Sequence, residues 1–180
     1  MMIRCDEYLT LVPFRDDMAA ELFAQVDHNR QYLERWLTWV THTQTPADSL
    51  AFLQSAQQLS EDDGMFRGAV VMNERLIGTI GFHDFQSSDR AASIGYWLDE
   101  RMTGQGIMTR SVRQLVQYGF ETLDLHRIEL RAATENDKSW RIAERVGFQR
   151  EGCLRECALV NGVYLSHYVY GLLRSEYSIV

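Results

Sequence analysis

The sequence has few cysteines and few prolines for a chain of 180 residues. Its three cysteines, Cys5, Cys153 and Cys157, are an odd number that builds no disulfide framework, and a Cys-x3-Cys spacing without a nearby histidine is no zinc signature. We therefore expect free thiols in a reducing, cytoplasmic environment. Two prolines and no serine- or glycine-rich run leave no evident linker, so we expect one domain over residues 1–180.

Long apolar runs and a positive charge balance are also lacking. No window approaches the ~20 apolar residues of a membrane span, and residues 1–11 hold Arg4, Asp6 and Glu7 where a secretory signal has an apolar segment. We expect no membrane partner. Lys and Arg number 18 against 25 Asp and Glu, which gives a formal net charge of −7. A nucleic-acid binder carries a basic face, so we expect no nucleic-acid partner, whereas a cationic substrate such as an amine is mildly favoured.

Metal-binding patterns are missing among the five histidines, which show no His-Glu-x-x-His or other paired spacing. We expect no metal site.

Hydrophobic periodicity and turn residues predict a mixed α/β sheet with an antiparallel front half. Thr45 followed by Pro46 is typical of a helix start, Asn161-Gly162 of a hairpin turn, and Gly147 of a helix end. The expected strands cover residues 8–14, 65–72, 76–85, 91–98, 126–132, 148–159 and 163–173. The expected helices cover residues 16–28, 47–59, 105–123 and 135–147, and residues 29–40 are expected to form a further helix or a helical turn.

The stretch 96–110, YWLDERMTGQGIMTR, places a glycine turn between an expected strand and an expected helix. Glycine lacks Cβ, so the backbone can approach an anion closely, and the first turn of a helix offers free N–H groups and a positive dipole end. The motif is Arg101-x-x-Gly104-x-Gly106. No Gly-Lys-Ser/Thr follows, so it is no Walker A loop, and Thr109 stands where a dinucleotide fingerprint has its third glycine. These residues predict a pyrophosphate site for a nucleotide-like cofactor.

With its surroundings, this stretch resembles the acetyl-CoA-binding motif of the GNAT family of N-acetyltransferases, which carries Gln/Arg-x-x-Gly-x-Gly/Ala between a strand and the following helix. Asn136-x-x-Ser139, followed by ERVGF at 144–148, resembles a second motif of the family, in which Arg145 replaces the common lysine. The resemblance covers nearly the whole chain. It implies an α/β GNAT fold, with a mixed, mostly antiparallel central sheet that is splayed in the middle and flanked by helices.

The resemblance implies an acetyl-CoA-dependent N-acetyltransferase. The phrases GYWLDERMTGQGIMT and RWLTWV are most similar to the branch that acetylates N-terminal serine or alanine of ribosomal proteins, and that branch also implies a homodimer. Two alternatives stay open. The acceptor could be a small amine, such as a polyamine, an antibiotic or an amino-acid conjugate, or the protein could be a non-catalytic CoA sensor. The presence of both Asn136 and Ser139 argues against a sensor.

The residues expected to hold acetyl-CoA form the strand end, the glycine turn and the start of the last helix. The amide-rich pantetheine arm could pair with the end of strand 91–98 as an added strand would, provided that this strand splays from strand 126–132. A backbone N–H near Leu98 could polarise the thioester carbonyl, an effect of about 3 kcal/mol. The full set is Tyr96, Trp97, Leu98, Arg101, Met102, Thr103, Gly104, Gln105, Gly106, Ile107, Met108, Thr109, Asn136, Ser139 and Arg145.

The expected reaction is direct attack by a neutral amine. An α-amine has an ordinary pKa of about 7.7–8.0 and a lysine amine one of about 10.4, so the lack of an obvious strong base favours N-terminal acceptors. Glu129 is the candidate base, through water, although an ion pair with Arg127 or Arg131 would also explain it. Many family members use a tyrosine as general acid where this chain has Trp140, so Ser139 is the candidate proton donor, with helix capping as the alternative.

Three further residues are candidates for the acceptor site. Trp36 and Trp39 lie three apart, so on a helix they would share one face. They could form an aromatic pair in the core or at a dimer interface, or an apolar wall for the acceptor. His83 could line the site or be structural.

Overall fold

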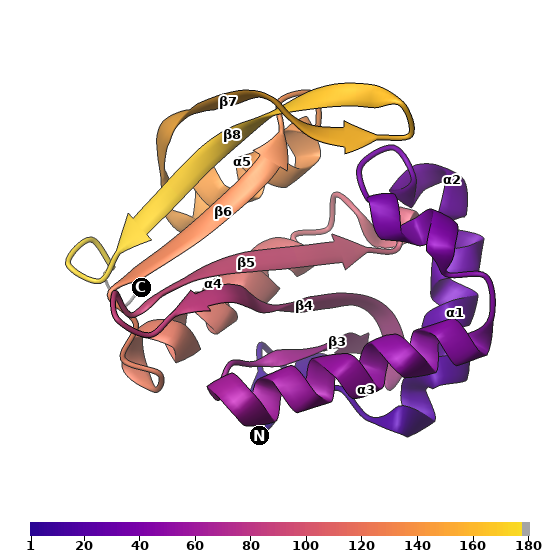
Figure 1. The fold of residues 1–180 in the computed structure, drawn as a ribbon. Helices are drawn as coiled ribbons and strands as arrows, with labels where there is room; N and C mark the ends of the chain where they lie inside the picture. The colour runs from indigo at the N-terminus through magenta and orange to yellow at the C-terminus, as the bar shows by residue number, and fades with distance from the viewer. Residues whose placement is uncertain (178–180) are drawn as a thin grey trace.

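The computed structural model describes residues 1–177 and contains one eight-stranded sheet with the order β1-β2-β3-β4-β5-β6-β8-β7 (Figure 1). Every neighbouring pair is antiparallel except β5–β6. The predicted mixed, mostly antiparallel sheet is confirmed. The strands are β1 (Ile3–Arg4), β2 (Leu9–Pro13), β3 (Arg67–Met72), β4 (Arg75–Gln86), β5 (Ala91–Leu98), β6 (Arg127–Ala133), β7 (Gln149–Val160) and β8 (Val163–Leu173).

Helices cover both sides of the sheet (Figure 1). On one side, α4 and α5 bury an apolar face that includes Val112, Leu115 and Phe120 against the central strands. On the other side, α1 and α3 form a second core that includes Leu22 and Leu53. The helices are α1 (Ala19–His28), α2 (Arg30–Leu33), α3 (Pro46–Asp63), α4 (Ile107–Glu121) and α5 (Asp137–Val146), with 3-10 turns at Asp16–Met18, Thr38–His42 and Glu100–Met102. Within residues 1–177, no helix combines the length and apolar content needed to cross a membrane.

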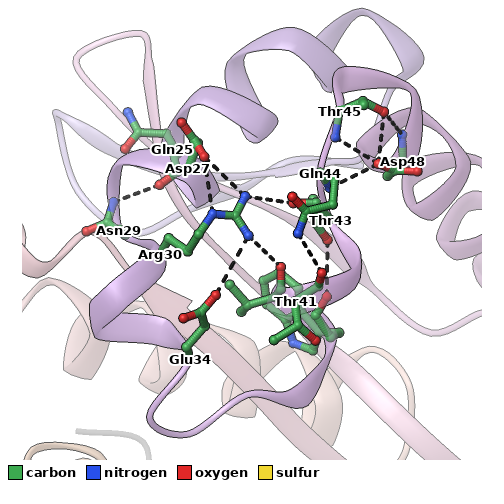
Figure 2. Close-up of polar contacts among 12 residues, drawn as sticks. Gln25, Asp27, Asn29, Arg30, Glu34, Thr41, Thr43, Gln44, Thr45 and Asp48 are labelled. Atoms are coloured by element: carbon green, nitrogen blue, oxygen red, sulfur yellow. Dashed lines mark hydrogen bonds and ion pairs between the residues drawn. The ribbon is translucent and has the colours of Figure 1, made fainter. Parts of the chain in front are cut away.

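The helix ends follow the local signals. The Thr45 side chain accepts a hydrogen bond from the backbone N–H of Asp48, whose carboxylate accepts one from the Thr45 N–H, and Pro46 occupies the first helical position of α3 (Figure 2). Gly147 ends α5 with φ +102°, in the left-handed region that favours glycine. Both predicted boundaries are confirmed because they depend on contacts within a few residues.

The sheet opens in its middle. β5 pairs with β6 only from Ala91 opposite Arg127 to Ile94 opposite Leu130, although β5 continues to Leu98. Over its remaining length, β6 stays paired with β8. The predicted splay between these two strands is therefore present (Figure 1). Their pairing ends at Ile94.

Of the two possibilities expected for residues 29–40, a helix or a helical turn, the structure contains the turn and not a continuous helix. α2 ends at Leu33, Leu37 is extended (φ −127°, ψ 116°), and a 3-10 turn follows. The reason is tertiary, because the Arg30 guanidinium donates hydrogen bonds to the carbonyl oxygens of Val40 (2.8 Å) and Thr43 (2.7 Å) and so folds the segment back on itself (Figure 2). Strand β1 was also not predicted, since two residues carry no periodic signal.

Candidate active site

A cavity of about 1060 Å³ lies where β5 and β6 diverge. Its walls come from the end of β5, the glycine turn, the start of α4, the end of β6 and the start of α5, and residues 32–37 close another side. Thirteen of the fifteen residues expected to hold the cofactor line it, namely Tyr96, Trp97, Leu98, Met102, Thr103, Gly104, Gly106, Ile107, Met108, Thr109, Asn136, Ser139 and Arg145.

The glycine turn forms a cradle with room for an anion. Gly104 (φ +78°) and Gly106 (φ +71°) both adopt the left-handed conformation, and Gly106 directly precedes α4. A Cβ built on Gly104 would meet no heavy atom of the described residues within 4 Å, so this position faces open space. Arg110 and Arg145 line the same cavity, and the Arg110 guanidinium is also paired with Asp6 at 2.9 Å. Free N–H groups at a helix start, open space and two cations suit a diphosphate.

Arg101 and Gln105 do not line the cavity. The Arg101 guanidinium binds the carboxylate of Asp99 at 2.6 and 3.1 Å, and Gln105 donates to the carbonyl of Arg101. Burial opposes ionisation of Asp99, but the hydrogen bonds from the Arg101 side chain and backbone N–H outweigh it and lower the pKa of the carboxyl. These residues therefore hold the loop that leads into the cradle.

Replacement of Asp99 by Asn is expected to destabilise the protein at pH 7 by about 1 kcal/mol, since it weakens the charge-assisted hydrogen bonds between the buried Asp99 carboxylate and the half-exposed Arg101 guanidinium. The pKa of Asp99 is lower in the folded than in the unfolded chain, so the ionised carboxylate stabilises the fold above about pH 4, the ordinary Asp pKa. That stabilisation is lost as the pH falls through the folded-state value. Urea unfolding should therefore show a gap between the wild type and Asp99→Asn that closes below pH 4. A gap that persists at pH 2 would contradict the ion-pair origin.

Ser139 and Tyr96 form a pair of hydroxyls in the cavity wall. The Tyr96 hydroxyl donates to the Ser139 carbonyl oxygen (3.0 Å) and lies 3.1 Å from Ser139 Oγ. Burial raises the pKa of Tyr96 well above its ordinary value, and the hydrogen bond with Ser139 offsets only part of the rise. The phenol therefore keeps its proton at neutral pH. The pairing was not predicted, because it joins β5 to α5 across 43 residues.

Asn136 occupies the N-cap position of α5, but within the described chain its side chain makes no capping hydrogen bond. It lines the cavity, as Ser139 does. The Asn136 side chain therefore does not cap α5, and its amide is available to a ligand.

Glu129 does not line the cavity. Its carboxylate receives hydrogen bonds from Arg131 at 2.6 Å and from Arg127 at 3.2 Å, the ion pair that the sequence left as an alternative. Arg127 also binds Glu151 on β7. A role as base stays a prediction for Glu129.

The two tryptophans lie apart. Trp36 lines the cavity, whereas Trp39 lies outside it, 38% exposed, with its ring centroid 6.3 Å from that of Trp97. They do not share a helical face, because the chain between them is extended at Leu37. His83 lines the cavity, as expected.

The structure adds cavity residues that the sequence did not single out. They include Arg131 on β6 and His167 on β8. Burial lowers the pKa of His167, nearby Arg131 lowers it further, and Glu135 opposes this, so His167 is neutral at pH 7. Isolated polar residues on strands carry no sequence signal. Further polar members are Asp84, Ser93, Arg110 and Lys138.

Arg30 organises the segment that brings Tyr32, Leu33, Trp36 and Leu37 to the cavity. Besides the two carbonyls it binds, its guanidinium contacts Asp27 (3.1 Å) and Glu34 (3.9 Å) (Figure 2). The tip of the β7–β8 hairpin also reaches this segment, through a hydrogen bond of 2.7 Å from Asn161 to the Glu34 carbonyl.

Replacement of Arg30 by Ala is expected to lower the free energy of unfolding by about 2 kcal/mol, because two carbonyls lose a charged donor. The KM of the acceptor should rise while CoA affinity stays unchanged, since residues 32–37 are not among the residues expected to hold the cofactor. Urea unfolding, steady-state kinetics and calorimetry would measure the three quantities. Arg15→Ala is the matched control, since its ion pair with Asp17 is exposed and worth about 0–1 kcal/mol. Equal effects of the two substitutions would contradict the organising role of Arg30.

Comparison with known proteins gives consistent matches. A family model described as an acetyltransferase (GNAT) domain matches residues 8–149. YdaF of Bacillus subtilis (strain 168) is 30% identical over 179 residues, which cover 97% of this chain and 96% of YdaF. The ribosomal-protein-serine acetyltransferase of Escherichia coli (strain K12) is 28% identical over 162 residues, 90% of each chain. A solved ribosomal L7/L12 alpha-N-protein acetyltransferase in complex with coenzyme A is 25% identical, with a TM-score of 0.93 over 96% of this chain and 98% of that one.

Proposed function

Because this chain belongs to the GNAT acetyltransferase family, we propose that it transfers the acetyl group of acetyl-CoA directly to the N-terminal α-amine of a ribosomal protein. The observation that supports this most is the cavity at the splay of β5 and β6, which joins a glycine cradle to the Tyr96–Ser139 pair. The name of the Escherichia coli relative supports the choice of acceptor.

The residues present fit CoA. The backbone of residues 104–109 would hold the diphosphate, with Arg110 and Arg145 beside it. β5 beyond Ile94 is not paired with β6, so it offers free backbone groups to the pantetheine amides, and the Asn136 amide is available as well. When bound, acetyl-CoA supplies the acetyl group as a reactive thioester.

Ser139 would donate a proton from Oγ to the departing sulfur, and Tyr96, whose hydroxyl oxygen lies 3.1 Å from Ser139 Oγ, would hold that side chain in place. Glu129 would act as base only through water, because its carboxylate is bound by two arginines. Cytoplasmic location, a homodimer and independence from metal are further parts of the proposal that follow from the sequence.

The test is an assay of thiol release from acetyl-CoA over a panel of amines. The panel contains peptides that begin with Ser or Ala, the same peptides with a blocked N-terminus and an internal lysine, and a polyamine. Turnover of the free N-termini alone is expected, with mass spectrometry placing the acetyl group on the α-nitrogen. Turnover of the polyamine alone would move the acceptor to small amines, and measurable CoA binding without turnover of any amine would indicate a sensor.

A further inference from the structure

His83 lies on the face of the sheet opposite α4 and α5. It pairs across the strands with Ser93, and Ser93 pairs with Glu129, so the three side chains form one row on this face. The neighbouring row, from Phe82 to Leu130, is buried in the core that α4 covers. Of the first row, His83 and Ser93 line the cavity.

The imidazole of His83 rests against Gly95, the residue at which β5 leaves β6. A Cβ built on Gly95 would lie 3.2 Å from both Cδ2 and Nε2 of His83, closer than an ordinary van der Waals contact. The pairing of β5 with β6 ends one residue earlier, at Ile94. Because Gly95 has no side chain, the Nε2 edge of the ring can lie where β5 begins to separate from β6.

Asp84 holds the other edge of the ring. Nδ1 of His83 lies 2.9 Å from Oδ2 of Asp84. An ionised carboxylate only accepts hydrogen bonds, so Nδ1 carries the proton, and Nε2 of the neutral ring keeps its lone pair. The β4–β5 register is irregular between His83 and Gln86, and Asp84 has φ +51°, so a bulge turns its side chain toward the ring.

We propose that His83 is a catalytic residue, whose Nε2 takes a proton from the ammonium group of the acceptor while Asp84 holds the ring in the tautomer that can do so. This inference rests on the proposed transfer to an amine. Tyr96, which contacts Ser139, alternates with Gly95 along β5, so His83 and Ser139 lie on opposite faces of the strand. The amine can enter from one face while the sulfur leaves toward the other.

The protons balance without a further reactant. Of the three protons on the acceptor ammonium, one passes to Nε2 of His83 and then to solvent, to which half of this side chain is open. The freed amine forms the C–N bond as the C–S bond breaks. A second proton leaves the nitrogen and replaces, through water, the one that Ser139 Oγ gives to the sulfur. The third stays in the amide.

The charges around His83 favour it over Glu129 as the proton acceptor. Two strand spacings, about 10 Å, separate the two backbones, and Arg127 and Arg131 already bind the Glu129 carboxylate. Asp84 is the charged group in contact with the ring. The remaining ionisable side chains of the cavity include Arg131 and His167 on the facing strands and Tyr32, Tyr96, Arg110, Lys138 and Arg145.

The test compares the pH dependence of kcat/KM for the wild type and His83→Gln on the best peptide of the panel. Histidine takes up a proton between pH 5 and 8, so the wild type should lose activity on the acid side. His83→Gln should have a kcat/KM about 100-fold lower at pH 8 and should lack this acid limb. Protonation of the acceptor amine affects the rate equally with both proteins, so a difference between the two pH profiles comes from the enzyme. NMR titration of His83 in the free wild type should have a midpoint equal to that of the limb.

Matched variants separate the proton transfer from folding. Asp84→Asn keeps a residue that tolerates positive φ, so we expect an intermediate loss of activity with the limb retained. His126→Gln, exposed and outside the cavity, should behave as the wild type, and CoA affinity should be unchanged throughout. Wild-type activity and an intact limb in His83→Gln, or loss of the limb in Glu129→Gln instead, would overturn the role of His83 but not the transfer itself. A wild type that acetylates no amine would overturn both.

Discussion

Replacement of Gly104 by Val is expected to abolish CoA binding while the protein still folds. Gly104 has φ +78°, and a Cβ there would point into open space at the cradle. A valine side chain would occupy the volume that the diphosphate needs and would push the backbone N–H groups of the turn away from it. We expect the Kd of CoA, measured by calorimetry, to rise about 100-fold or more, a loss of roughly 2.7 kcal/mol.

Gly64 provides the control for this substitution. It ends α3 with φ +72°, and a Cβ there would also meet nothing within 4 Å among the described residues. Gly64→Val therefore introduces the same kind of backbone strain, about 1–2 kcal/mol, far from the cavity. If Gly104→Val and Gly64→Val lower the free energy of unfolding equally but only Gly104→Val loses CoA binding, the assignment of the phosphate site to this turn is supported. Retained binding in Gly104→Val would remove the phosphate site from this turn.

Replacement of Ser139 by Ala is expected to lower kcat about 100-fold, the lower end of the range for general acid catalysis, with little change in CoA affinity. We expect the lower end because the Tyr96 hydroxyl, 3.1 Å from Ser139 Oγ, stays protonated in the same cavity wall. Without Ser139, this hydroxyl can still assist proton transfer to the sulfur through a water molecule. Tyr96→Phe should have a smaller effect, since Ser139 remains in place. The double variant should lose more than either single one.

Pre-steady-state and steady-state kinetics of thiol release would measure these changes. Ser49→Ala is a suitable control, because Ser49 is a buried helical serine of α3 whose Oγ has no partner among the described residues and lies outside the cavity. An unaltered kcat in Ser139→Ala would remove Ser139 from catalysis. A large loss of CoA affinity would instead assign it to cofactor binding.

The family, the sheet and the cradle could be predicted from the sequence. Gly104 and Gly106 adopt positive φ angles, which glycine accepts readily because it has no side chain. The spacing of apolar residues in 105–123 predicts the face that α4 buries. The capping pair of Thr45 and Asp48 sets the start of α3 within four residues. These features depend on neighbours in the chain, so the sequence displays them directly, and the matched family model confirms the resemblance that they suggested.

Tertiary structure decided which polar side chains meet in the cavity. Arg30 bends the 34–43 segment by binding carbonyls ten and thirteen residues away, which brings Trp36 to the cavity and leaves Trp39 outside. Arg127 and Arg131 both bind the Glu129 carboxylate. The bulge in β4 and the lack of a side chain at Gly95 position His83 where β5 separates from β6. By itself the sequence determined the fold and the backbone conformation of the glycine turn, because local backbone preferences and periodicity encode them. The partners of Ser139, Glu129 and His83 depend on strand register and on contacts between distant segments, and only the folded chain decides those.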